Sequence, residues 1–378
     1  MGALTPFIGI LYSALEDANQ EATGFIRAAT KNMEASRVAK GQMVYAPVGK
    51  VSKPTEIVPG VNPEEVEMPD IDKVGITIEH ESKVAITLTG NESVGLDASG
   101  NYDAVTKANF TQALRQLNNE IEAYIAKKVV AGASRGFGDG SAAAFSDTDS
   151  LNDLAQLGLI LDDNGCPQDG RNFVMTNTAL AALRAKSMLN NAYKLGSDEF
   201  IRYGYTDPVL GFRLWSSFGL KKRSASTGSG YQAGDDYEIG ATELTLGTGS
   251  GTIQAGDGIK FGDTTYIVNN DLSAPGIITL GRPGLLAPVT NGTGGTLVQG
   301  YTPSVAFHTD AVHLATRAPA LPMMGDSAID RFLLVSDKSG LVYEVAVYPQ
   351  YKQVVMEIGI AYGASVMNSE NVAVLLSK

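Results

Sequence analysis

The feature that most constrains this sequence is one long helical pattern between residues 102 and 133. Its apolar side chains recur at steps of three and four residues: Phe110, Leu114, Leu117, Ile121, Tyr124, Ile125 and Val129. No proline or glycine interrupts the pattern before Gly132. At a rise of 1.5 Å per residue, a helix of this length is roughly 45 Å long. We therefore predict a structural strut that is longer than an ordinary globular helix.

Composition indicates that strands and turns make up much of the remainder. Of the 378 residues, 42 are glycine, about 11% against a usual ~7%. Hydrophobic residues at 44% and charged residues at 19% place the chain among folded globular proteins. The length predicts two to three domains, and a long helix combined with many short strands predicts an α+β fold.

Five prolines between residues 41 and 75 predict an extended, irregular segment: Pro47, Pro54, Pro59, Pro63 and Pro69. Each proline removes a backbone donor and breaks ladder pairing. A structureless stretch of this length is improbable inside a compact domain. We therefore expect this extended loop to contact a neighbouring subunit through its apolar side chains, which are Val44, Tyr45, Val48, Val51, Ile57 and Val58.

An alternating stretch follows the extended loop. Apolar residues occupy every second position on both sides of a polar stretch at residues 79–83, and they are Val74, Ile76, Ile78, Val84, Ile86 and Leu88. Period-two alternation around a short polar turn is typical of a β-hairpin. We predict such a hairpin over residues 74–90.

The first 40 residues carry one apolar stripe with helical spacing: Leu4, Phe7, Ile8, Leu11 and Leu15. Two interpretations fit the pattern equally. The stripe belongs either to a core helix of the chain itself or to an N-terminal arm that docks on a partner.

The rest of the chain divides by composition. Residues 151–160 predict a short helix, residues 173–175 a buried strand, and Asn177 a candidate cap for a helix that ends near Lys186. Residues 225–304 have few charges, many Gly and Thr, and short strand-like runs, which predicts an inserted small β-barrel or sandwich. Residues 341–376 predict two strong strands and a final short one.

Charge and cysteine content exclude several classes of protein. A net charge of −12 disfavours a primary role in binding nucleic acid or an anionic membrane surface. The single cysteine, Cys166, cannot form an intrachain disulfide, which fits a reducing cytoplasm. No stretch approaches the ~18 apolar residues of a membrane span. The N-terminal apolar stretch has no Lys or Arg before it, so we do not expect a secretory signal.

A search for catalytic or metal chemistry yields weak candidates. Gly132-Ala-Ser134-Arg-Gly136 matches the nucleophile-elbow pattern, but a predicted helix precedes it where a strand is needed. The three histidines, His80, His308 and His313, have no spacing that suits a zinc site. The densest basic cluster, residues 221–223, is typical of a solvated surface. We therefore predict no catalytic, cofactor-binding or metal-binding residues and no enzymatic activity.

The order of these segments resembles the coat proteins of tailed bacteriophages with the Hong Kong ninety-seven fold, in their P-twenty-two-like podophage branch. Four stretches carry the resemblance: the alternating residues 76–89, the strut at 102–133, the strands at 255–261 with 266–268, and residues 305–317. The last is the most specific, with the run Phe307-His-x-x-Ala-x-x-Leu-Ala-Thr-Arg317-x-Pro319. The C-terminal residues 343–376 also resemble the strands that close that family's peripheral domain.

The resemblance implies a division of the chain into five parts. They are an N-terminal arm (1–40), an extended loop and hairpin (41–90), a peripheral domain with the spine helix (91–150 and 336–378), an axial domain (151–224 and 305–335), and an inserted β domain (225–304).

The resemblance also implies a major capsid protein of the virion, assembled in the host cytoplasm. Its subunits would form pentamers and hexamers in an icosahedral shell around double-stranded DNA. Expected partners are a scaffolding protein and a portal protein, with a decoration protein as an optional further one. Contacts to DNA would be non-specific at most, and none to a membrane are expected. Crosslinking through Lys50 or Lys53 is not predicted, because the branch resembled does not crosslink.

Three other functions remain open at this point. The first is an encapsulin-like nanocompartment, a shell of the same fold that holds an enzyme instead of DNA. The second is a surface adhesin, favoured by the Gly/Thr-rich strands alone. The third is a hydrolase with Ser134 as its nucleophile.

Overall fold

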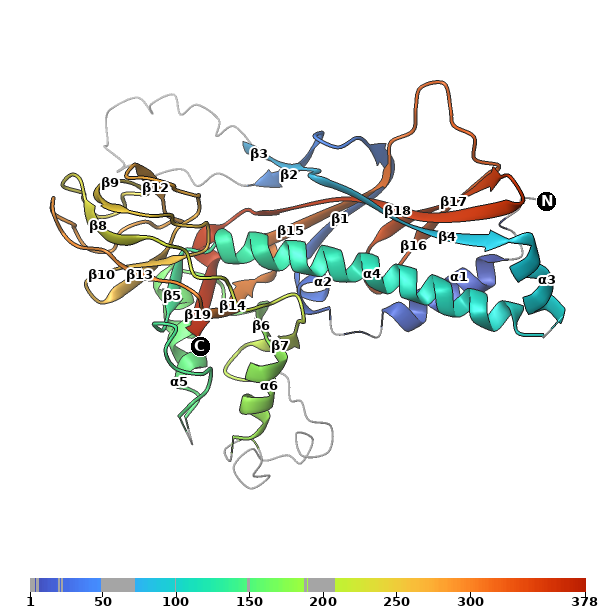
Figure 1. The fold of residues 1–378 in the computed structure, drawn as a ribbon. Coiled ribbons are helices and arrows are strands. Elements are labelled where there is room, and N and C mark those ends of the chain that lie inside the picture. Colours follow the sequence, from blue (N-terminus) through green and yellow to red (C-terminus); the bar gives the residue numbers. More distant parts are fainter. Residues whose placement is uncertain are drawn as a thin grey trace, which may run out of the picture.

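A computed structural model describes residues 4, 7–19, 21, 23–48, 72–98, 100–147, 150–186, 189 and 208–378. The fold is α+β, as predicted, and is organised along helix α4 (Tyr102–Ala131), which runs from beside helices α1 and α3 to the edge of the inserted strands (Figure 1). The predicted strut is therefore confirmed. The apolar stripe of α4 is buried from Phe110 to Val129, which is why this helix fixes the position of the sheet beside it.

One sheet lies along helix α4. In the described part of the chain its strands are ordered β1 (Thr30–Val38), β15 (Val312–Pro319), β18 (Gln353–Val366), β17 (Val342–Gln350) and β16 (Asp330–Val335), with β4 (His80–Thr89) also pairing with β18. Residues 353–359 of β18 pair with both β17 and β4, so these two strands occupy opposite edges of β18. The predicted C-terminal strands are confirmed.

Helix α1 (Ile8–Ala18) packs against helix α4 and shares the apolar core of this sheet. Leu4, Leu11 and Leu15 are buried in the same core as Phe110 of α4 and Val345 of β17. Of the two interpretations of the N-terminal stripe, the structure supports the core helix and not an arm on a partner. Helix α2 (Gly24–Ala28) follows and leads directly into strand β1.

A second sheet crosses the end of helix α4. Among the described residues its order is β13 (Thr296–Val298), β10 (Gly258–Phe261), β11 (Thr264–Ile267), β5 (Arg135–Phe137), β19 (Val372–Ser377), β14 (Thr302–His308), β6 (Arg171–Met175) and β7 (Arg213–Ser216). Helices α5 (Asn152–Asp163) and α6 (Asn177–Arg184) share a separate apolar core with strands of this sheet.

The inserted region has its own core but is not separate from the body. Strands β8 (Ser229–Ala233), β9 (Glu243–Ser250) and β12 (Ile277–Thr279) form a small sheet. Tyr231, Leu246 and Ile278 pack with residues of β10 and β11 in one apolar cluster. Strand β11 also pairs with β5, where Tyr266 faces Arg135. The inserted region is therefore joined to the body by a continuous β-ladder.

The predicted hairpin over residues 74–90 is wrong in its pairing. Strand β3 (Asp72–Thr77) pairs with β2 (Met43–Val48), whereas β4 pairs with β18. The backbone of Ile78 exchanges hydrogen bonds with Gly41 and Gln42 instead of turning back towards β3. Alternation of apolar and polar residues indicates that one face of each strand is buried, but it does not determine which strand is the partner.

The helix cap predicted at Asn177 is also displaced by one residue. The side chain of Thr176 accepts a hydrogen bond from the backbone N–H of Ala179 (3.2 Å), and Thr176 has extended backbone angles. Asn177 is the first helical residue. Thr176 fulfils the geometry of an N-cap, because its oxygen satisfies a donor of the first turn.

Sheet membership differs from the predicted domain division at two places. Strands β15 and β16, assigned with residues 305–335 to an axial domain, lie in the sheet beside α4. Strand β19, assigned to the peripheral domain, lies between β5 and β14 in the second sheet. Both sheets take strands from distant parts of the chain, so a boundary drawn along the sequence cannot separate them.

None of the helices that the structure describes combines the length and apolar character needed to cross a membrane.

Candidate assembly surfaces

Ser134 is a buried structural residue. Its hydroxyl donates to the carbonyl oxygen of Val372 (2.9 Å) and lies 3.4 Å from the side-chain amide of Asn164. It follows helix α4 and precedes strand β5, the reverse of the strand-then-helix order that a nucleophile elbow requires. The geometry therefore gives Ser134 no access to a substrate.

The three histidines make separate local contacts. His80 packs against the rings of Tyr124 and Tyr362, with ring centroids 4.8 and 5.5 Å away. His308 Nδ1 accepts a hydrogen bond from the backbone N–H of Asp310 (3.2 Å), and burial lowers the pKa of His313. Within the described residues, no group of His, Cys, Asp and Glu side chains could hold a metal ion.

The base of the extended loop exposes apolar side chains. Tyr45 and Met43 on strand β2 are each 58% exposed. Val44 points to the other face and packs near the buried Ile76 and Ile78. Of the remaining predicted contact residues, Val48 ends β2 opposite Asp72, while Val51, Ile57 and Val58 lie outside the described residues.

A second apolar surface projects from the sheet beside α4. The loop of residues 320–329 joins β15 to β16 and stands away from the sheet (Figure 1). Met323 and Met324 at its tip are fully exposed, and Ile329 at its end is largely exposed. Our prediction from the sequence missed this surface. The signal was present in the adjacent methionines between Pro322 and Gly325, which no helix or strand pattern could bury.

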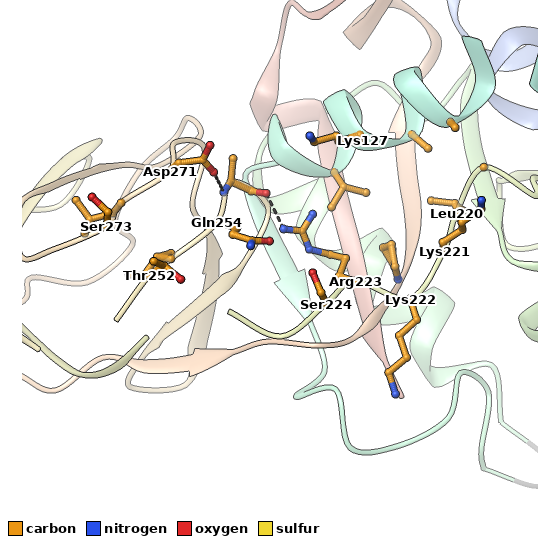
Figure 2. Close-up of a pocket in the computed structure, with 18 residues that line it drawn as sticks. Lys127, Leu220, Lys221, Lys222, Arg223, Ser224, Thr252, Gln254, Asp271 and Ser273 are labelled. Atoms are coloured by element: carbon orange, nitrogen blue, oxygen red, sulfur yellow. Dashed lines mark hydrogen bonds between the residues drawn. The ribbon is translucent and has the colours of Figure 1, made fainter. Parts of the chain in front are cut away.

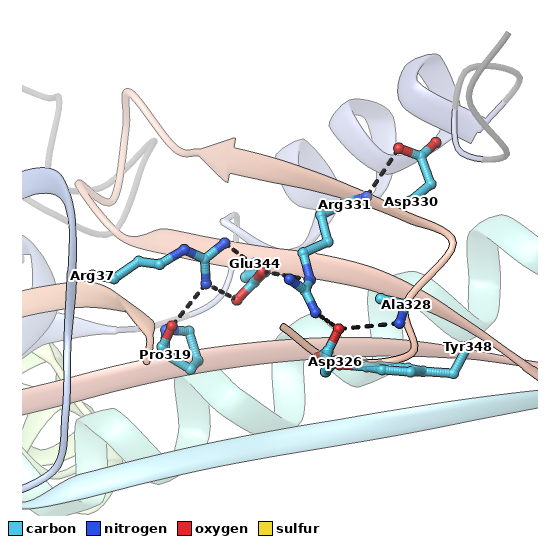
Figure 3. A network of polar contacts seen from close by, with 8 residues as sticks. All are labelled: Arg37, Pro319, Asp326, Ala328, Asp330, Arg331, Glu344 and Tyr348. Carbon is cyan, nitrogen blue, oxygen red and sulfur yellow. Dashed lines mark hydrogen bonds and ion pairs between the residues drawn. The ribbon is translucent and has the colours of Figure 1, made fainter. Parts of the chain in front are cut away.

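A network of charged groups holds the two ends of this loop (Figure 3). Glu344 on β17 is buried, and its carboxylate accepts hydrogen bonds from Arg37 at 2.6 and 2.8 Å. Arg37 also donates to the carbonyl oxygen of Pro319 (2.8 Å) at the start of the loop. Arg331 lies 3.4 Å from Glu344 and pairs with Asp326 at the end of the loop. Hydrogen bonding to Glu344 raises the pKa of Arg37, so the guanidinium stays charged.

A third exposed apolar pair lies at the turn between β17 and β18. Tyr351 is 87% exposed and Val354 is partly exposed. The backbone carbonyl of Lys352 in this turn accepts a hydrogen bond from the N–H of Gly90, at the end of β4 (3.3 Å). The turn is therefore anchored, although its large side chains face solvent.

Polar contacts fix strand β4 to helix α4. Glu79 accepts hydrogen bonds from Lys128 Nζ (2.7 Å) and the Tyr124 hydroxyl (2.9 Å). Burial alone would raise the pKa of Glu79, but the hydrogen bonds from Lys128 and Tyr124 outweigh it and lower the pKa. The carboxylate is therefore ionised at neutral pH and ties the base of the extended loop to the strut.

A pocket of about 730 Å³ separates the end of helix α4 from the inserted region (Figure 2). Lys127 of α4, Lys221, Lys222 and Arg223 line it, so the basic cluster of residues 221–223 borders a concave surface. Arg223 is already engaged, since it donates to the carbonyl oxygen of Ala255 (2.7 Å) and lies 3.4 Å from the buried carboxylate of Asp257.

This chain is similar to known proteins in structure but not in sequence. No protein-family model matches the chain, and no curated protein matches it in sequence. Among solved structures, the capsid of the cyanophage P-SCSP1u is similar with a TM-score of 0.48 and 14% identity, over 94% of this chain and 88% of that chain. The mature capsid of bacteriophage PhiM1 is similar with a TM-score of 0.46 and 11% identity, over 94% and 86% of the two chains. The virus-like particle from Pyrococcus furiosus is similar with a TM-score of 0.44 and 11% identity, over 98% and 99%.

Proposed function

We propose that this chain is the major capsid protein of a tailed bacteriophage, a structural subunit that self-assembles into the icosahedral shell around a double-stranded DNA genome. One observation carries the proposal. Large apolar side chains are exposed on three separate projections, represented by Tyr45, Met323 and Tyr351. Contiguous apolar groups on a soluble protein mark contact surfaces. Projections at several places suit a subunit that contacts several neighbours at once.

The architecture also supports the proposal that this chain is a subunit of a shell. Helix α4 and strand β18 run side by side along an elongated molecule (Figure 1). The ladder between β2 and β3 forms the base of the extended loop. The run of residues 305–317, on which the resemblance to phage coat proteins depends most, passes from β14 in one sheet to β15 in the other. These residues thus connect the two halves of the fold.

The finer assignment follows the same resemblance. We place the chain in the P-twenty-two-like podophage branch, with subunits in pentamers and hexamers. A scaffolding protein and a portal protein are its partners, with a decoration protein as an optional further one. Assembly takes place in the host cytoplasm. A net charge of −12 limits contact with packaged DNA to non-specific contacts.

Electron microscopy of the purified chain, expressed alone and together with its scaffolding protein, tests the proposal. We expect closed shells of uniform diameter. A chain that stays monomeric under both conditions, at concentrations where its fold is intact, would refute it. Shells that enclose a protein cargo and never DNA would instead support the encapsulin-like nanocompartment.

A further inference from the structure

The pocket beside helix α4 carries an excess of positive charge in the described part of the chain. Its lining contains four basic side chains and one acidic side chain, Asp271. Arg223 is engaged by Ala255 and Asp257, but Lys127, Lys221 and Lys222 are exposed and form no ion pair within the described residues. Three free ammonium groups around one pocket in a chain of net charge −12 indicate a site for an anionic partner.

The lining of the pocket is mixed. Polar side chains such as Ser224, Thr252 and Gln254 lie beside the partly exposed Leu272, while Ala126, Val130, Leu220 and Ile253 are nearly fully buried. A DNA duplex is too wide to enter a pocket of about 730 Å³. A peptide that combines carboxylates with apolar side chains would match both the basic side chains and the partly exposed Leu272.

The sequence of this chain contains such a peptide. Between residues 64 and 72, five acidic residues alternate with apolar ones, and the acidic residues are Glu64, Glu65, Glu67, Asp70 and Asp72. This stretch belongs to the extended loop that we expect to contact a neighbouring subunit. Its apolar members are Val66, Met68 and Ile71.

We propose that the pocket of one subunit binds the acidic segment of residues 64–72 from a second copy of this chain. The inference rests on the proposed function, because it requires copies that meet in an assembly. In this contact the basic cluster of residues 221–223 binds the extended loop of a neighbouring subunit. Lys127 lies on helix α4 and Lys222 on the segment that passes the end of this helix (Figure 2), so two separate elements supply charge to the rim of the pocket.

Direct binding is the first test. A fluorescently labelled peptide of residues 61–73 is titrated with the full-length protein and followed by anisotropy. We expect saturable binding that weakens as salt is raised from about 50 to about 500 mM, because exposed charges are screened. Lys127→Glu combined with Lys222→Glu is expected to weaken binding roughly tenfold or more. Lys352→Glu, which makes the same kind of charge change in the distant β17–β18 turn, serves as the control and should leave binding unchanged.

A change on the peptide side leaves the protein untouched. A peptide with Glu64, Glu65 and Glu67 replaced by Gln should lose binding to the same degree as the double lysine variant. Binding that is equally tight for both peptides would overturn the proposal. The proposal would also be overturned if a DNA duplex, and not the peptide, binds the protein in a way that the lysine variant loses.

A charge-swap experiment tests contact between copies. One chain carries Lys127→Glu and Lys222→Glu, and another carries Glu64→Lys, Glu65→Lys and Glu67→Lys. Each is expected to assemble poorly alone, whereas an equal mixture should recover shells, since each segment then meets a complementary pocket on the other chain. If the mixture fails but both changes in one chain recover assembly, the contact is within a subunit and the inference is wrong.

The two proposals fail in different ways. If each charge-swapped variant forms normal shells by itself, the proposed docking contact is wrong, whereas the proposed capsid function is unaffected. If the peptide binds specifically but the protein never forms shells, the proposed capsid function is wrong, whereas the proposed docking contact is supported. Circular dichroism of each variant confirms that the altered chains are folded.

Discussion

Arg37 on strand β1 and Glu344 on strand β17 form a bidentate ion pair, although they are 307 positions apart in the sequence. The two guanidinium nitrogens of Arg37 lie 2.6 and 2.8 Å from the carboxylate oxygens of Glu344. The Glu344 side chain is 7% exposed and Arg331 approaches it from the other side. One buried carboxylate thus connects the first strand of the sheet to the two ends of the projecting loop. The loop of residues 320–329 has a fixed base and a free apolar tip.

Replacing Glu344 by Gln should destabilise the subunit. The substitution leaves the Arg37 guanidinium without its counterion, whereas Arg331 keeps its ion pair with Asp326. Breaking one partner of a fully buried pair typically costs about 3–5 kcal/mol. Because the Arg37 side chain is 31% exposed, we expect roughly 2–3 kcal/mol. Urea unfolding measures the change. Glu357→Gln, which breaks the solvent-exposed pair with Lys83, is the control and should cost less than about 0.5 kcal/mol. Equal effects of the two substitutions would contradict this account.

Changing the tip of the loop should affect assembly and not folding. Met323→Ser with Met324→Ser removes two fully exposed apolar side chains, which nothing in the described part of the chain covers. We expect an unchanged unfolding midpoint but slower or incomplete shell formation, measured by sedimentation. Ile239→Ser, at another exposed apolar position, is the matched control. If both variants assemble like the parent, the tip is not a contact surface.

The register of β2 and β3 allows the extended loop to be removed cleanly. Val48 pairs with Asp72 at the end of the ladder, so residues 49–71 can be replaced by Asn-Gly, which favours a two-residue hairpin turn. We expect a folded monomer by circular dichroism that forms no shells or shells of the wrong size. Normal shells would show that the loop is dispensable. Loss of the folded signal would show that the loop belongs to the core of the monomer.

Acid should weaken the contact between strand β4 and helix α4. The folded-state pKa of Glu79 lies below its ordinary value of 4.5. Its contribution to stability is therefore present above that value and is lost as the pH falls through the folded-state pKa. Since Glu79 is more than a third exposed, Glu79→Gln should cost about 0.5–1 kcal/mol at pH 7. The difference from the parent should shrink below about pH 4. A difference that stays constant from about pH 7 to about pH 3.5 would argue against this assignment.

Ser134→Ala should leave shells intact. The substitution removes the hydrogen bond to the carbonyl of Val372, and a lost buried hydrogen bond costs about 1 kcal/mol. We expect a slightly lower unfolding midpoint and normal assembly. An esterase activity of the parent protein that disappears in the variant would restore the hydrolase interpretation.

Patterns within one segment predicted the fold well where a single face is buried. Helix α4 has the predicted bounds to within two residues at its C-terminal end, because its apolar stripe is buried from Phe110 to Val129 against helix α1 and strands β18 and β4. Strands β17 and β18 are equally clear in the sequence. The pairing of β3 was predicted wrongly, since the partner of an alternating strand depends on residues far away in the chain.

Contacts between distant residues could not be predicted in the same way. Lys127 and Lys222 line the same pocket, and the spacing of charges in the sequence carries no sign of this. The same is true of the pairing of Arg37 with Glu344. The methionines of the 320–329 loop were visible in the sequence, but only the fold shows that both are fully exposed.

The β-ladder between β11 and β5 has a mechanical consequence. Through it, strands from the inserted region and from the body form one sheet in the described part of the chain, and hydrogen-bonded ladders over a close-packed core transmit strain instead of absorbing it. Internal pressure on the inserted region would thus be passed to the end of the strut as a load shared across several strands. The subunit would respond as a stiff plate, and deformation of the shell would concentrate at the joints between subunits.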